Sequence, residues 1–90
     1  MDTIAITATP KGHRIWIQGL KGKGITATHV TVVMGTDVIG LVFSPNGKRK
    51  VTQSKGGLVD LQSKAVTEWA AGATEAHVTV TGDLIEIRRA

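Results

Sequence analysis

The 90-residue sequence predicts a mainly β protein with one short helix, and three observations carry that prediction. Most of the chain consists of short runs in which apolar and polar residues alternate, which is the pattern of a half-buried strand. Turns rich in glycine and proline separate these runs. Helical spacing between good helix formers occurs in one stretch, residues 63–71.

Two alternating runs open the chain, at residues 3–8 and 14–18, and the isoleucines of the second run share its inward face. Residues 9–12 form the turn between them, because proline presets φ and glycine tolerates positive φ. Trp16 lies on the outward face beside Arg14. It is either part of a surface platform or a half-buried ring that covers one end of the fold.

A glycine-rich segment at residues 19–25 predicts a basic loop with at most one turn of helix, since three glycines make a regular helix costly there. The loop carries Lys21 and Lys23. Glycines beside lysine are typical of a phosphate-binding loop, but the segment has no Gly-Lys-Ser or Gly-Lys-Thr triplet and no strong helix follows it.

Two hairpins are predicted at residues 28–43 and 76–88, each with a glycine in its turn. Each begins near a His-Val-Thr-Val motif, at residues 29–32 and again at residues 77–80. The second strand of the first hairpin, residues 38–43, is apolar on both faces, so we expect it to be the most buried strand.

Residues 48–53 predict a short edge strand that follows a Ser-Pro-Asn-Gly turn. The strand begins with Lys48, Arg49 and Lys50 and has one large apolar side chain, so most of it faces water.

Residues 58–62 read either as a strand or as the start of a helix. The helix is expected from Ser63, which can cap it, to Gly72, which suits the left-handed position that ends a helix. Trp69 follows the apolar spacing of this segment, and we expect it to anchor the helix in the core.

The chain is expected to be one domain, residues 1–90, made of two related halves at about 3–43 and 44–89. In each half a Pro-x-Gly turn precedes a basic strand that ends in glutamine. A connecting segment that ends in glycine follows, and a His-Val-Thr-Val hairpin closes the half.

This order of elements resembles the swapped-hairpin β-barrel of AbrB-like and SymE-like proteins, whose half-barrel runs strand, glycine turn, strand, short helix and hairpin. The segments that carry the resemblance are residues 4–8, 10–12, 15–17, 20–25, 30–32 and 39–41, and then Val51 and residues 61–72, 78–80, 82 and 84–87. The resemblance implies a small barrel of two pseudo-repeated halves in one chain. It also implies that the basic residues near the first turn and strand contact DNA, here Lys11, Arg14, Lys48 and Arg49.

Charge is distributed unevenly along a chain whose net charge is +4. Residues 1–55 hold eight basic and two acidic residues, a balance of +6, whereas residues 56–90 hold three basic and five acidic residues, a balance of −2. A basic face for a polyanion is one interpretation. The other is that lysines in turns keep a small β protein soluble and protect its edges.

No catalytic or metal-binding constellation is recognisable in the sequence. There is no cysteine, no Gly-x-Ser-x-Gly elbow, and no pair among His13, His29 and His77 at metal-ligand spacing. A twofold relation between the halves would bring His29 near His77, but repeat ancestry explains their positions equally well. We therefore expect no enzyme activity, no metal and no cofactor.

The function that we expect is a small DNA-binding protein that regulates transcription by contacting duplex phosphates through a basic face. Three aromatic residues offer few stacking platforms for single strands. The alternatives are a protein-interaction module, antitoxin-like or a phage accessory protein, and an RNA-binding protein. The expected nucleic-acid-binding residues are Lys11, His13, Arg14, Lys21, Lys23, Lys48, Arg49, Lys50 and Lys55.

The sequence also favours a cytoplasmic protein without a membrane partner, since it has no apolar run of membrane-spanning length and no signal-peptide pattern. A chain of this size has a thin core, so a homodimer that buries more apolar surface is a further expectation.

Overall fold

The computed structural model describes residues 2–90, and this part of the chain forms strands joined by short turns and one α-helix. The strands are β1 (Asp2–Ala5), β2 (Thr7–Thr9), β3 (Gly12–Gln18), β4 (His29–Met34), β5 (Val38–Phe43), β6 (Arg49–Lys50), β7 (Leu58–Ser63), β8 (Glu75–Thr81) and β9 (Leu84–Arg89). The helix α1 (Lys64–Ala70) follows β7, and two single 3₁₀ turns, η1 (Lys21–Lys23) and η2 (Ser54–Gly56), lie in loops. The prediction of a mainly β protein with one short helix is confirmed.

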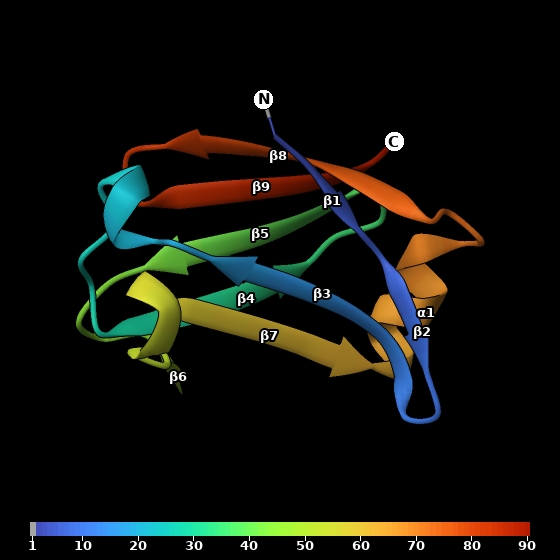
Figure 1. Ribbon diagram of the computed structural model, residues 1–90, viewed down its shortest axis with the longest axis horizontal. Helices are drawn as coiled ribbons and strands as arrows, with labels where there is room; N and C mark the ends of the chain where they lie inside the picture. The colour runs from blue at the N-terminus through green and yellow to red at the C-terminus, as the bar shows by residue number, and fades with distance from the viewer. Residues whose placement is uncertain (1) are drawn as a thin grey trace.

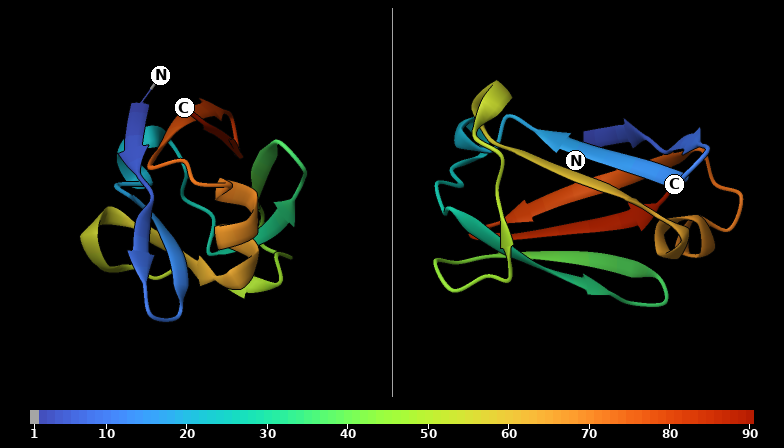
Figure 2. Two further views of the ribbon diagram at one scale, coloured as in Figure 1. Left: turned by 90° about the vertical axis from the view of Figure 1, so that its right-hand side faces the viewer. Right: turned by 90° about the horizontal axis from the view of Figure 1, so that it is seen from below.

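The strands make two antiparallel sheets that face each other across the interior (Figures 1 and 2). The larger sheet has the order β1-β8-β9-β5-β4-β6, and the smaller has the order β2-β3-β7. One continuous run of chain crosses from β1 in the first sheet to β2 in the second. The crossing is at Ile6, which is buried and whose N–H donates to the carbonyl oxygen of Thr74.

The expected closed barrel is not formed, because the two sheets part along two seams. One seam is a cleft of about 320 Å³ whose lining includes Ile4 of β1 and Ile17 of β3. The other is a cleft of about 190 Å³ whose lining includes Val32 of β4 and Leu61 of β7. No ladder joins the two sheets at either seam: the larger sheet ends at β1 and β6, and the smaller ends at β2 and β7.

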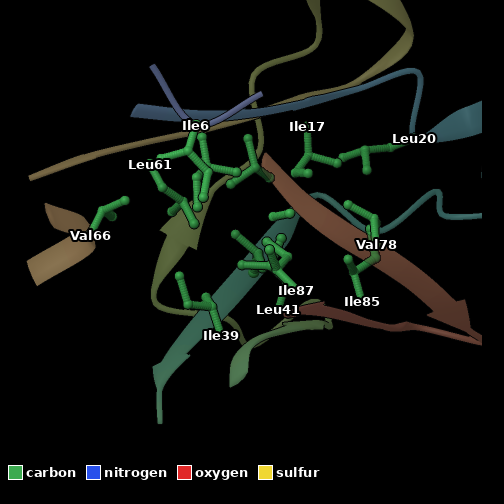
Figure 3. Packing of buried hydrophobic residues seen from close by; sticks show 14 of the residues in the cluster. Ile6, Ile17, Leu20, Ile39, Leu41, Leu61, Val66, Val78, Ile85 and Ile87 are labelled. Atoms are coloured by element: carbon green, nitrogen blue, oxygen red, sulfur yellow. The ribbon is translucent and has the colours of Figure 1, made fainter. Parts of the chain in front are cut away.

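The core between the sheets is made of apolar side chains from both (Figure 3). Ile17 and Leu61 come from the smaller sheet, and Leu41, Ile85 and Ile87 come from the larger. No polar or charged residue is buried anywhere in residues 2–90. Aliphatic side chains therefore fill the interior, as expected for a chain with three aromatic residues.

The helix forms where the sequence predicts it. The Oγ of Ser63 accepts a hydrogen bond from the N–H of Val66, which is the expected N-cap. Trp69 is buried, so the prediction that it anchors the helix in the core is confirmed. The helix ends one residue earlier than predicted, because Ala71 rather than Gly72 takes the first left-handed position, at φ 50°.

The two other open questions of local structure are also answered. Residues 58–62 are strand, since β7 pairs with β3 along its whole length, including Leu61 with Ile15. The glycine-rich loop contains only the single turn η1, which confirms the expected basic loop. Gly24 ends that turn at φ 81°, a conformation that favours glycine.

The strand order of the larger sheet is symmetric between the two halves of the chain. Exchanging β1 with β6, β4 with β8 and β5 with β9 gives the same order of strands, read from the opposite edge of the sheet. β3 pairs with β7 in the smaller sheet, so these two strands are exchanged as well. The basic strand at residues 49–53 therefore corresponds to β1 rather than to residues 14–18, which corrects the alignment of the halves made from the Pro-x-Gly turns.

The repeated His-Val-Thr-Val motifs are out of register in the structure. The N–H of Ile6 donates to the carbonyl oxygen of Thr74, and the N–H of Val51 donates to that of Thr28 in the corresponding position. Thr28 thus matches Thr74, and His29 matches Glu75 rather than His77. The slip is two residues, which keeps every side chain on its own sheet face and therefore leaves the alternating pattern intact.

Candidate nucleic-acid interface

The turns η1 and η2 and the strand β6 lie at one end of the molecule (Figure 1), and five lysines belong to these segments or stand next to them. The two turns pack together, since the N–H of Gly19 donates to the carbonyl oxygen of Lys55 over 3.2 Å and that of Leu20 donates to Gly57 over 3.3 Å. β6 continues into the segment that leads to η2. We call this surface the basic end, and its residues are Lys21, Lys23, Lys48, Lys50 and Lys55.

Most of these lysines carry uncompensated charge. Lys21, Lys48, Lys50 and Lys55 are exposed, and none has an ion-pair partner within 4.0 Å among residues 2–90. Lys23 is half-buried, and its Nζ lies 3.6 Å from Oδ2 of Asp2. An exposed lysine keeps its hydration and mobility, so it can contact a phosphate with little loss of existing interactions.

Arg14 is held by a carboxylate rather than left open. Its Nε and Nη2 donate to Oδ1 and Oδ2 of Asp60, each over 2.9 Å, across the pairing of β3 with β7. Its guanidinium carbon also lies 4.6 Å from the centre of the Trp16 ring. The ion pair is about one-third exposed on both sides, so Arg14 is oriented but its charge is balanced.

Trp16 joins this pair to the basic end. Its side chain is 39% exposed, and Nζ of Lys55 lies 5.5 Å from its ring centre. Lys55 reaches this position from a left-handed backbone conformation, φ 54°, which is uncommon for a residue with a side chain. A cleft of about 430 Å³ opens beside Trp16 and Arg14. Trp16 is thus partly exposed between Arg14 and Lys55, and this is compatible with both interpretations of it, surface platform and half-buried ring.

Arg49 lies in the strand β6 and is exposed like its neighbours, but its guanidinium is held by a backbone contact. Its Nη2 donates to the backbone carbonyl oxygen of Asp60. Arg49 pairs with buried Val30, whereas Lys50 pairs with His29, so the two side chains lie on opposite faces of the sheet. Arg49 thus spans the seam between the sheets and is less available to a ligand than Lys48 and Lys50.

Two of the predicted residues lie away from the basic end. Lys11 is exposed in the β2–β3 turn, at the opposite end of the molecule beside α1 (Figure 1). His13 is half-buried against the helix, where its backbone N–H and its Nδ1 lie 2.7 and 2.9 Å from Oγ1 of Thr67. Its contacts connect β3 to α1.

The histidines are not brought together. β5 and β9 separate the strand of His29 from that of His77. Nδ1 of His29 lies 2.8 Å from Oγ1 of Thr28, and Nδ1 of His77 lies 3.3 Å from Oγ1 of Thr3. Within residues 2–90 no three histidine, cysteine or acidic side chains are grouped as metal ligands would be. No helix in the same range has the length and apolar character needed to cross a membrane.

Asp60 is the residue that sequence reasoning missed. It is not among the predicted site residues, although its carboxylate pairs with Arg14 and its backbone oxygen accepts from Arg49. The one signal for it was its place in the alternation of residues 58–62, but its neighbour on the adjacent strand depends on a pairing that only the fold determines.

Comparison of the chain with protein-family models, with curated proteins and with solved structures gives no match.

Proposed function

We propose that this chain binds duplex DNA through the basic end, as a small regulator. The observation that carries the proposal is the gathering of exposed lysines without ion-pair partners, contributed by η1, η2 and β6. Acidic side chains near this surface are already engaged: Asp2 with Lys23, and Asp60 with Arg14. A duplex backbone presents closely spaced negative charges to which such a surface is complementary.

Lysines of this kind position a duplex without reading its sequence. Each contacted phosphate releases counterions, so affinity falls steeply as salt rises. Arg14 is the residue with the geometry for base readout, but its bidentate pairing with Asp60 must open before it can reach a base edge. The proposed complex is therefore dominated by phosphate contacts.

The exchange-symmetric strand order supports a relation to the swapped-hairpin proteins that the sequence resembles. The first strand of each half pairs with the hairpin of the other half: β1 with β8, and β6 with β4. We infer that the two halves descend from one half-barrel unit and that the seams have opened since. Of the four residues that the resemblance implies as DNA contacts, only Lys48 belongs to the basic end, so the proposed surface rests on the exposed lysines rather than on the positions of that family.

The test compares two double variants that remove the same charge from opposite ends of the molecule. Lys48→Ala with Lys50→Ala lies at the basic end, and Lys11→Ala with Lys64→Ala lies at the other end. Binding of a fluorescent duplex is measured by anisotropy at several salt concentrations. We expect the first pair to lower the salt slope of log K by up to about 1.8, at about 0.9 per phosphate contact, and the second to leave it nearly unchanged.

Two results would contradict the proposal. Absence of wild-type binding at low salt removes nucleic acid as the ligand and favours the protein-interaction alternative. Equal losses in the two double variants mean that net charge alone matters and that the basic end is not the interface.

RNA is the second candidate, and Trp16 is the observation that favours it. An exposed indole flanked by two cations beside a cleft offers a stacking surface for an unpaired base. Structured RNA with single-stranded loops should then displace the duplex in competition. Trp16→Ala would weaken RNA binding while leaving duplex binding close to wild type.

A further inference from the structure

One side of the strand β4 is an uncovered sheet edge. Only its first two residues, His29 and Val30, pair with β6. From Thr31 to Met34 no strand in residues 2–90 pairs on that side, and β7 lies across the cleft that Val32 and Met34 line together with Leu61. The matching edge of β8 is covered, because β1 pairs with four of its residues. The first half supplies β1, which covers four residues of β8. The second half supplies only β6, which covers two residues of β4 and leaves the rest of that edge without a partner strand.

The backbone groups along this edge point outward at alternate residues. The carbonyl oxygen of Thr28 accepts from Val51 on the β6 side. In an antiparallel ladder the direction alternates, so Val32 and Met34 also turn their N–H and C=O groups toward the open edge. Such groups are a template for another strand.

The side chains of the edge favour association rather than protection. Residues 31–34 read Thr-Val-Val-Met and contain neither charge nor proline, the usual protections of a free edge. Val33 is 53% exposed and Met34 is 40% exposed. Below the edge, a cleft of about 320 Å³ lies between Met34 and Trp69, whose buried indole N–H has no hydrogen-bond partner in the described residues.

We propose that this edge pairs with the same edge of a second copy of the chain, antiparallel about Val33. Residues whose backbone groups point toward the open edge must face one another across the two copies. Val32 then lies opposite Met34 of the second copy, and Met34 lies opposite Val32 of the second copy. Val33 then lies opposite Val33 of the second copy, on the outer face of a continuous sheet that runs through both molecules. Two pairs with outward backbone groups supply the missing hydrogen bonds.

Charge complementarity identifies a second copy as the occupant. In this register the β4–β5 turn of each molecule lies beside β6 of the other. That turn carries Asp37, whose Oδ1 lies 2.8 Å from Nη2 of Arg89 in the same chain but whose side chain is still 81% exposed. β6 carries Lys50 with Lys48 next to it, and neither lysine has an ion-pair partner among residues 2–90. Each copy thus brings an acidic turn to the other's basic strand. The proposal does not depend on nucleic-acid binding.

Cysteine cross-linking tests the pairing and its register together, because the chain has no cysteine of its own. The variant Val33→Cys places two thiols in a pair without hydrogen bonds, whose Cα atoms are about 4.5 Å apart and within the range that a disulfide spans. Val42→Cys is the matched control, since it is similarly exposed, at 43%, on the neighbouring strand β5 but away from the edge. We expect rapid formation of a linked dimer from the first and slow, collision-limited linkage from the second.

Sedimentation of the cysteine-free protein over a series of concentrations gives an independent readout. The wild type should shift from monomer to dimer as concentration rises. Val33→Lys should remain monomeric and melt like Val42→Lys, because a lysine at an edge blocks pairing without entering the core. A wild type that stays monomeric throughout, or equal cross-linking rates for the two cysteine variants, overturns the proposal.

Discussion

Asp60 contacts two arginines of this molecule, one through its carboxylate and one through its backbone. Asp60 receives both donors of Arg14 through its side chain and one donor of Arg49 through its backbone. The cluster is partly exposed, so water screens the ion pair and its contribution to stability is small, about 1 kcal/mol or less. The pair also holds Arg14 beside the Trp16 ring, so Arg14 is not free to meet a ligand while the pair is closed.

Replacement of Asp60 by asparagine should therefore release Arg14 at little cost to the fold. We expect tighter duplex binding with a steeper salt dependence, and a free energy of unfolding within about 1 kcal/mol of wild type. Glu86→Gln is the control, since it removes the same charge from the exposed pair with Arg88 on the other sheet. Anisotropy titrations and urea unfolding measure the two effects. Equal gains in the two variants would mean that only net charge had changed.

At the scale of elements, the start of α1 packs against Gly12, the first residue of β3. Gly12 has φ 120°, and a Cβ added there would lie 2.5 Å from the backbone carbon of Ser63, the helix cap. His13, the next residue, contacts Thr67 of the helix. The absence of a side chain at Gly12 is what lets the helix begin where the strand β7 ends.

Gly12→Ala should consequently be among the more damaging small substitutions. The left-handed φ and the backbone clash together should lower the free energy of unfolding by about 1–3 kcal/mol or more. Gly22→Ala is the matched control, because a Cβ there meets nothing within 4 Å and no positive φ is required. Thermal unfolding followed by circular dichroism compares the two. Similar melting temperatures would show that the β2–β3 turn adjusts freely against the helix.

At the scale of the whole molecule, neither half can bury its own hairpin. β5 pairs with β9 in the centre of the larger sheet, and each outer strand of that sheet belongs to the half opposite the hairpin that it covers. β3 pairs with β7 in the same way. Every ladder except those within the hairpins and that of β2 with β3 therefore joins the two halves. The two halves are therefore related by an exchange of strands and do not form two adjacent domains.

The two halves should accordingly fail to fold apart. We expect peptides of residues 1–43 and 44–90 each to show the circular dichroism of an unfolded chain, because each lacks the partner strands of its core. Trp16 reports on the first and Trp69 on the second through fluorescence. A cooperative melt of either peptide alone would contradict the exchange of strands. In the intact chain, circular dichroism and tryptophan fluorescence should report unfolding at the same temperature, as a single transition.

The local elements could be predicted from the sequence because they depend on neighbours along the chain. Alternation placed the strands, and Ser63 with the apolar spacing that includes Trp69 placed the helix. These signals are short-range: side-chain period, capping and the cost of glycine in a helix. The lysines of the basic end were likewise visible as a charge imbalance before their position was known.

Tertiary structure alone decided which strands pair, in which register, and where the sheets part. The repeated His-Val-Thr-Val motif pointed to an alignment two residues away from the one that forms, because a slip of two preserves sheet face and cannot be detected from alternation. Distant pairings also set the site: Arg14 is neutralised by Asp60, and Lys11 lies at the opposite end of the molecule from the lysines of the basic end. Such contacts join residues well separated in sequence, and their energies depend on geometry that exists only after both sheets have formed.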